Sequence, residues 1–351
     1  MAERRTGFLV AAGTTIACLF LGIWISAYLT VWPAPQTSQG DALVLYDPEI
    51  GMVPNRNSHT RRVYPSVPQR PTPLVFDVYT DDRGSRIDGP GARNRSRGGL
   101  MVIGGSFSWG YALANSVTYA RRLARSFNTS VVNLSGAGFG SVQALQMLER
   151  NRDLVPKVVI YGIIAHHYER NVSACAPSDY PFCLDVSHVA WDHVGEPFIA
   201  PPASNGVRRI EQHVKRMGFD PMRWLTHGLD VIYGRVTYGI SARTAPGQAK
   251  KDEALAFILR KMERVVAGIG GHLVVVYMPT NYWASQPSLP VIAKKIGGRL
   301  HYLDLTERFK RSRAQGGPEV YIKNDGHPTA AAHAIMAEEI EALIRRENLL
   351  P

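Results

Sequence analysis

Cysteine is scarce in this sequence, with three residues among 351. So few cysteines exclude a small scaffold held together by several disulfides and a four-thiolate zinc site. Cys18 lies in an apolar N-terminal stretch, whereas Cys175 and Cys183 bracket a seven-residue segment that contains two prolines. If this part of the chain is exported, oxidation favours a disulfide between Cys175 and Cys183, with two free thiols or a metal pair as the alternatives.

A standard metal-ligand pattern is also absent. Four histidines between residues 166 and 193 have spacings that match no known metal motif; they are His166, His167, His188 and His193. Internal repeats and low-complexity tracts are lacking as well, which excludes a repeat architecture. We therefore expect neither a metal nor a cofactor.

Acidic residues are fewer than basic ones. The 29 Asp and Glu against 40 Lys and Arg give a formal net charge of +11, while hydrophobic residues at 45% and charged residues at 20% are ordinary globular values. The basic residues are scattered, and the local cluster Arg93, Arg95 and Arg97 is typical of a solvated surface. Outside a membrane, anionic lipid headgroups or acidic polysaccharide fit this charge better than nucleic acid, which we do not expect as a partner.

One charge-free run stands out, at the N-terminus. Phe8–Trp32 contains 25 residues without a charged side chain, which is long enough to span a bilayer with some tilt. Arg4 and Arg5 precede the run, so the positive-inside rule places the N-terminus in the cytoplasm. We expect an uncleaved anchor over residues 1–32 in the cell inner membrane, with the rest of the chain in the periplasm. A cleaved signal peptide is the alternative.

The remaining chain divides at residue 100. Residues 33–99 are expected to form a short linker, over 33–40, and an N-terminal extension with strand-like runs such as Pro73–Tyr79. From Leu100 onward, continuous apolar runs alternate with amphipathic segments. The predicted strands are Leu100–Ile103, Ser130–Leu134, Val158–Ile164, His272–Met278 and Leu300–Leu305, and the predicted helices are Val117–Phe127, Ser141–Arg150, Asp252–Ile269 and Thr329–Arg346.

This alternation predicts the fold class. Strands that are apolar throughout and separated by helices indicate a parallel sheet covered on both faces. We predict an α/β domain over residues 100–351, with a doubly wound, flavodoxin-like sheet of five strands in three α/β/α layers. An insertion at about 172–250 interrupts it, and its aromatic residues could cap the site; they are Trp191, Trp224, Tyr233 and Tyr238. Functional groups then belong at the carboxyl ends of the strands.

Two distant fragments supply the groups of a hydrolytic triad. Ser106 follows the first predicted strand and two glycines, whereas Asp325 and His327 precede the last predicted helix. A serine needs a base to become a nucleophile, and a histidine needs an acid to fix its tautomer. The alternative is that all three residues only cap helices, a common role for serine and aspartate.

With these fragments the chain resembles the SGNH, or GDSL-type, hydrolase superfamily over roughly residues 100–347. The usual Gly-Asp-Ser block appears as Gly104-Gly105-Ser106, and the last block as Asp325-Gly326-His327-Pro328. Val132–Gly140 matches the second block, in which Gly138 corresponds to a glycine of the oxyanion hole. The resemblance implies a serine esterase with Ser106 as nucleophile, His327 as base and Asp325 as its acid. It also implies an oxyanion hole built from the amides of Ser106 and Gly138.

The third block departs from the family pattern. The family expects Gly-x-Asn-Asp after the third strand, and here His166 occupies the asparagine position. A neutral imidazole also donates one N–H, so His166 can complete the oxyanion hole. His167 and Arg170 follow directly and are candidates for substrate contact, although Arg170 could instead pair with Glu169.

We therefore predict an extracytoplasmic serine esterase. It would hydrolyse or transfer an acyl group, with acetyl as one candidate, on an acylated carbohydrate or a lipid-like ester. The alternative is a non-catalytic envelope protein that keeps the fold as a binding or scaffolding module. The two hypotheses differ in whether Ser106, His327 and Asp325 converge.

Overall fold

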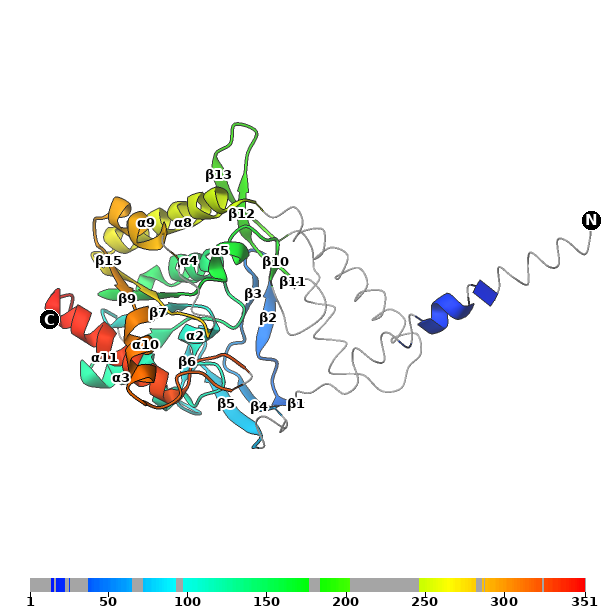
Figure 1. Cartoon of the computed structure of the whole chain (residues 1–351), viewed down its shortest axis with the longest axis horizontal. Helices are drawn as coiled ribbons and strands as arrows, with labels where there is room; N and C mark the ends of the chain where they lie inside the picture. Colours follow the sequence, from blue (N-terminus) through cyan, green and yellow to red (C-terminus); the bar gives the residue numbers. More distant parts are fainter. Residues whose placement is uncertain are drawn as a thin grey trace, which may run out of the picture.

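The computed structural model describes residues 14, 15, 17–22, 25, 37–64, 72–92, 97–176, 184–202, 246–281, 286, 288–323 and 325–350 (Figure 1). Most of the predicted anchor Phe8–Trp32 lies outside these residues. Within the described part, no helix has the length and apolar character needed to cross a membrane.

The centre of the molecule is a five-stranded parallel sheet with the strand order β15-β14-β9-β7-β8. Its strands are β7 (Leu100–Gly104), β8 (Val131–Asn133), β9 (Val158–Ile163), β14 (His272–Tyr277) and β15 (Leu300–Asp304). In chain order this is 2-1-3-4-5, the flavodoxin-like order, so the prediction of a doubly wound parallel sheet is confirmed. The three inner strands are buried almost throughout, as their apolar sequences require.

Helices cover both faces of the sheet (Figure 1). One face carries α4 (Ser141–Arg150), α8 (Gln248–Gly268) and α9 (Ser288–Ile296), and the other carries α3 (Tyr119–Ser126), α10 (Thr306–Ala314) and α11 (Ala330–Arg346). The helix α8 shows why these segments are helical. Its fully buried residues recur at three- and four-residue intervals and form one apolar face; they are Ala254, Leu255, Ile258, Leu259, Met262 and Val266.

The N-terminal extension is a β structure. The strands β1 (Thr37–Gly40), β4 (His59–Tyr64), β5 (Leu74–Thr80) and β6 (Arg86–Ile87) form an antiparallel sheet, and β2 (Val44–Asp47) pairs with β3 (Gly51–Pro54). The strand β1 occupies the last four residues of 33–40, the stretch that was expected to be a linker. From Phe76 onward β5 alternates buried and partly buried side chains, and its buried Phe76 and Val78 pack against Trp109 and Tyr111 of the core.

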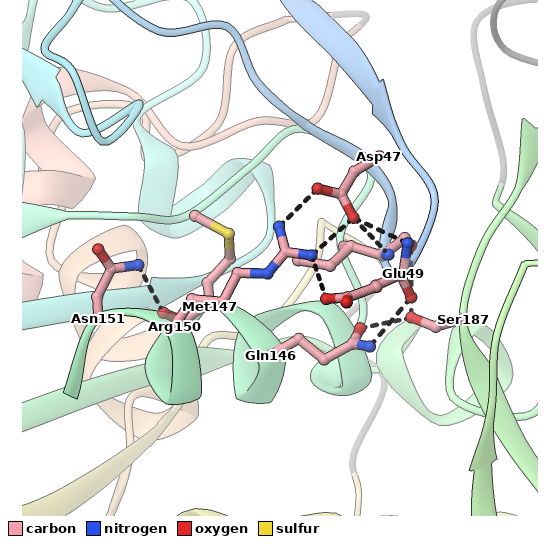
Figure 2. A network of polar contacts seen from close by, with 8 residues as sticks. Asp47, Glu49, Gln146, Met147, Arg150, Asn151 and Ser187 are labelled. Atoms are coloured by element: carbon pink, nitrogen blue, oxygen red, sulfur yellow. Dashed lines mark hydrogen bonds and ion pairs between the residues drawn. The ribbon is translucent and has the colours of Figure 1, made fainter.

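A polar network fixes the β2–β3 turn to α4 (Figure 2). The guanidinium of Arg150 donates to both carboxylate oxygens of Asp47, at 2.6 and 2.8 Å, and to Glu49 at 2.6 Å. Burial would raise the pKa of Asp47, but the hydrogen bonds from Arg150 and from two backbone amides lower it overall. Gln146 donates to the carbonyl of Glu49 and accepts from Ser187, so the same network reaches the insertion.

The described parts of the insertion are two short hairpins, β10 (Cys175–Ala176) with β11 (Leu184–Asp185) and β12 (His188–Trp191) with β13 (Pro197–Ala200). Trp191 packs against the α4 and α8 side of the core, where Lys250 lies 4.8 Å from its ring centre. Three of the four aromatic residues expected to cap the site lie outside the described residues; they are Trp224, Tyr233 and Tyr238. Cys183 also lies outside them, so its disulfide with Cys175 stays a prediction.

Candidate active site

Ser106 lies at the carboxyl end of β7, on a turn that requires glycine. Gly104 ends the strand with φ at +143°, and a Cβ there would lie 2.5 Å from the carbonyl oxygen of Gly162 on the adjacent strand β9. After Gly105 the chain enters the four-residue helix α2 (Ser106–Trp109), which ends at Gly110 with φ at +81°. The sharp reversal presents Ser106 as the first residue of a helix at the sheet edge.

His327 and Asp325 come from a tight loop before α11. Gly326 between them has φ at +84°, and Ile322 closes the loop by donating its N–H to the carbonyl of His327 at 2.8 Å. Asp325 Oδ1 accepts from the backbone N–H of His327, at 3.1 Å, and lies 2.6 Å from its Nδ1. The local fold of this loop therefore orients the carboxylate of Asp325 toward the imidazole of His327 without a contribution from Ser106.

The structure brings the three residues together, as the sequence predicts. His327 Nε2 lies 2.9 Å from Ser106 Oγ across a sequence separation of 221 residues. An ionised Asp325 can only accept, so Nδ1 carries the proton and Nε2 is left to accept from the Ser106 hydroxyl. Ser106 is 7% exposed, whereas the side chains of His327 and Asp325 are about one-fifth exposed, so solvent reaches the triad from the histidine side.

Aromatic rings hold the imidazole in place. Tyr111 stacks on His327 with ring centres 4.2 Å apart, and Phe107 lies 5.5 Å from it at a tilt. Phe76 of the N-terminal extension packs edge-on behind Tyr111 at 5.5 Å. Sequence reasoning missed these contacts, although the aromatic residues that follow Ser106 within five positions were a signal.

Two amides are available for an oxyanion. The N–H of Ser106 opens α2, where a helix amide has no intrahelical partner. Gly138 follows the neighbouring strand β8 with φ at +81°, and its N–H makes no hydrogen bond within the described part of the chain. The loop is tied to the nucleophile turn because Gly136 donates to the carbonyl of Gly104 at 3.1 Å.

His166 lies at the same edge of the sheet. It follows β9, the other neighbour of β7, and immediately precedes the short helix α5 (His167–Arg170). The residue is exposed at the surface, yet partial removal of water from its imidazole and the nearby charge of Arg170 lower its pKa, which favours the neutral form with one N–H. Its place in the oxyanion hole stays a prediction.

His167 lies in the core, which does not fit the predicted contact with substrate. It is fully buried, its Nδ1 lies 2.9 Å from the hydroxyl of Tyr161, and that hydroxyl donates to Ser141. Burial and the charge of Arg170 hold the pKa of His167 well below its usual value. Its Nε2 lies 2.8 Å from the position that a Cβ of Gly105 would occupy. The imidazole thus fills the space next to the glycine where the family carries aspartate.

Arg170 supports the oxyanion loop. Its Nη1 donates to the carbonyl of Phe139 at 3.0 Å, and burial lowers its pKa to about 10. The alternative pairing with Glu169 is wrong, since that carboxylate pairs with Lys251 at 3.5 Å. The guanidinium therefore fixes the backbone next to Gly138.

Comparisons with known proteins give the following. No family model and no curated protein sequence matches the chain. Among solved structures, a family two carbohydrate esterase from Clostridium thermocellum in complex with cellohexaose is 10% identical, with a TM-score of 0.42 over 90% of this chain and 100% of the other. An acetyl xylan esterase from the rumen bacterium Butyrivibrio proteoclasticus is 12% identical, with a TM-score of 0.38 over 79% and 70%. The psychrotrophic esterase EstA from Pseudoalteromonas sp. is 13% identical, with a TM-score of 0.36 over 70% and 96%. The chain thus resembles SGNH hydrolases in its motifs and is similar to these esterases at low identity.

Proposed function

We propose that this chain is a serine ester hydrolase of the SGNH type. The observation that carries the proposal is the continuous hydrogen-bonded series from Ser106 through His327 to Asp325. Helix capping alone does not account for it, because Asp325 Oδ1 contacts the imidazole and not only a backbone amide. A binding module would have no use for a buried hydroxyl held at 2.9 Å from an oriented imidazole.

The geometry supports a two-step acyl-enzyme reaction. The Oγ of Ser106 attacks the ester carbonyl while His327 Nε2 takes its proton, and the imidazolium then gives that proton to the departing alcohol. Asp325 stabilises the imidazolium. The N–H groups of Ser106, Gly138 and His166 hold the negative oxygen. Water, activated by the same imidazole, releases the acid; if a sugar hydroxyl takes the place of water, the same groups transfer the acyl group.

We propose an acyl group, with acetyl as one candidate, on a carbohydrate or a lipid-like ester. The net charge of +11 supports an anionic polymer or surface near the site of action.

A serine-reactive fluorophosphonate tests the function directly. The full-length chain, purified in detergent, is expected to lose ester hydrolysis in step with covalent labelling, and peptide mapping is expected to find the label on Ser106. Prior unfolding should prevent labelling, because the isolated hydroxyl is a poor nucleophile. A folded protein that resists the probe and hydrolyses no simple ester would support the binding module instead.

His166 is expected to contribute to turnover. Replacing it with alanine should lower kcat by about 10²-fold, the usual effect of losing one oxyanion donor. His166→Asn should recover part of the loss, because the amide also donates an N–H. The exposed His193 provides the control, since its replacement with alanine should leave kcat unchanged. Full activity of His166→Ala would place this residue outside the oxyanion hole.

We also propose that Phe8–Trp32 anchors the chain with the catalytic part in the periplasm. Arg4 and Arg5 on the N-terminal side of the apolar run support this orientation. Protease added to intact spheroplasts is therefore expected to cleave the chain after residue 32. Protection until the cells are lysed would reverse the orientation.

A further inference from the structure

Arg86 is a fully buried cation that reaches the nucleophile helix from the N-terminal extension. It lies on β6, and its side chain is among the largest with almost no exposed surface. Its guanidinium donates to three backbone carbonyls, those of Trp109 at 2.8 Å, Gly110 at 2.5 Å and Leu113. All three carbonyls belong to the segment that directly follows Ser106.

The carbonyl of Trp109, the last residue of α2, needs a partner, whereas the carbonyl of Gly110 also accepts the N–H of Leu113 at 3.3 Å. The last carbonyls of a helix have no intrahelical donor, and α2 is so short that most of its backbone is in this condition. A planar guanidinium presents several N–H groups in fixed directions, which suits three carbonyls that converge on one point. Arg86 therefore caps the carboxyl end of α2.

Burying this charge is expensive, so the arrangement is not an ordinary surface contact. Removal from water lowers the pKa of Arg86 to about 9, and Asp88 offsets that shift only in part. The carboxylate of Asp88 is itself engaged with Arg121 at 2.7 Å and with Asn115. Carbonyl dipoles at the end of α2 thus stabilise much of the buried positive charge.

The same segment contacts both reacting residues. The N–H groups of Gly110 and Tyr111 both donate to the carbonyl of Ser106 at 3.1 Å, so the capped turn is bonded to the nucleophile itself. The ring of Tyr111 stacks on His327 at 4.2 Å. A shift of the turn would therefore move the hydroxyl and the imidazole relative to one another.

We propose that Arg86 is a positioning residue, which holds Ser106 in line with His327 by fixing the turn that ends α2. The inference rests on the proposed esterase function. It implies that the N-terminal sheet, through Arg86 on β6, helps to set the geometry of the active site. At Gly110 the turn packs so closely against Thr118 and Arg86 that a side chain has no room. A Cβ at this position would lie 2.4 Å from Thr118 Cγ2 and 3.0 Å from an Arg86 nitrogen.

The test compares Arg86→Lys and Arg86→Gln with a matched control. Lysine keeps the charge but has no planar fork, and glutamine keeps one donor group without the charge. Arg83 lies three residues earlier on the same extension and pairs with Asp153 at 2.7 Å, away from the triad, so Arg83→Gln is the control. Hydrolysis of p-nitrophenyl acetate, the rate of fluorophosphonate labelling and thermal unfolding are measured for each variant in the full-length chain.

Arg86→Lys is expected to lower kcat and the labelling rate by about 10²-fold, because a displacement near 1 Å has effects of that size, with KM changed less than about threefold. Arg86→Gln should lower kcat and the labelling rate further, whereas Arg83→Gln should keep the wild-type kcat. Free guanidinium at concentrations that leave the fold intact should restore part of the labelling rate in Arg86→Gln.

Three results would overturn the proposal. One is wild-type kcat in a folded Arg86→Lys variant, and another is an equal loss of kcat in the Arg83→Gln control. The third is failure of both Arg86 variants to fold, which would assign the residue to stability alone. Labelling of Ser106 in the wild type is checked first, so that failure of the esterase proposal is separated from failure of the positioning proposal.

Discussion

Ser106→Ala is expected to reduce ester hydrolysis by a factor on the order of 10⁶, the loss found when a triad serine is removed. The only hydrogen bond of Ser106 Oγ seen in the described part of the chain is the one to His327, so the substitution removes the nucleophile and little else. The free energy of unfolding should fall by at most about 1.5 kcal/mol, the usual worth of one such bond. Initial rates on p-nitrophenyl acetate and a denaturant titration measure the two quantities.

An exposed serine ten residues further on provides the control for this variant. Ser116→Ala should keep the wild-type rate and stability, because the Ser116 side chain faces solvent. His327→Ala should match Ser106→Ala, and the double variant should be no worse, since the two residues act as one unit. Residual hydrolysis above about a tenth of the wild-type rate in Ser106→Ala would assign the chemistry to another residue.

Gly105→Asp is expected to lower kcat by about 10²-fold, although aspartate is what the SGNH motif carries at this position. A Cβ here would lie 2.8 Å from His167 Nε2 and 3.3 Å from the carbonyl oxygen of Phe139. The imidazole has little freedom to withdraw, because it is fully buried and its Nδ1 lies against the hydroxyl of Tyr161. Overpacking of this kind costs about 1 to 3 kcal/mol, and displacing the turn by 1 Å should lower kcat by about 10²-fold.

A double-mutant cycle tests the cause of that loss. In Gly105→Asp/His167→Ala the clash is removed, so the double variant should be more stable than the sum of the single changes by at least about 0.5 kcal/mol. Gly89→Asp is the control, because a Cβ at Gly89 meets no atom within 4 Å. Additive effects of the two single variants would show that glycine at 105 is not a response to the buried histidine.

The sheet and the triad could be predicted because each rests on a strong local pattern. The strand β9 is an unbroken apolar run, which only burial on both faces explains, and all five strands lie within two residues of their predicted bounds. Parallel strands share one carboxyl edge, so Ser106 could be placed at that edge. His327 was joined to it by the chemistry of a triad and by the resemblance of the Asp325-Gly326-His327-Pro328 block to the family motif.

The N-terminal sheet and the two histidines could not be predicted in the same way. The strands β1 to β6 are short, and they carry charged residues, such as Arg61 at an exposed position and Asp77 at a partly buried one, that weaken the apolar pattern. The sequence does not distinguish a buried arginine from a solvated one, so the burial of Arg86 could not be predicted. Which of His166 and His167 turns inward depends on where α5 begins, and helix ends are poorly defined by sequence.

The attachment of the β2–β3 turn to α4 also sets the order in which the molecule can be assembled. Arg150 and Asp47 are separated by 103 residues, and a nascent chain emerges from its N-terminus first. The extension therefore leaves the ribosome well before the surface on which it docks exists, and Phe76 and Val78 cannot yet pack against Trp109 and Tyr111 during that interval. The active site therefore forms only after these contacts between distant parts of the sequence are made. Until then the apolar side chains of the extension are accessible to a chaperone or to another copy of the chain.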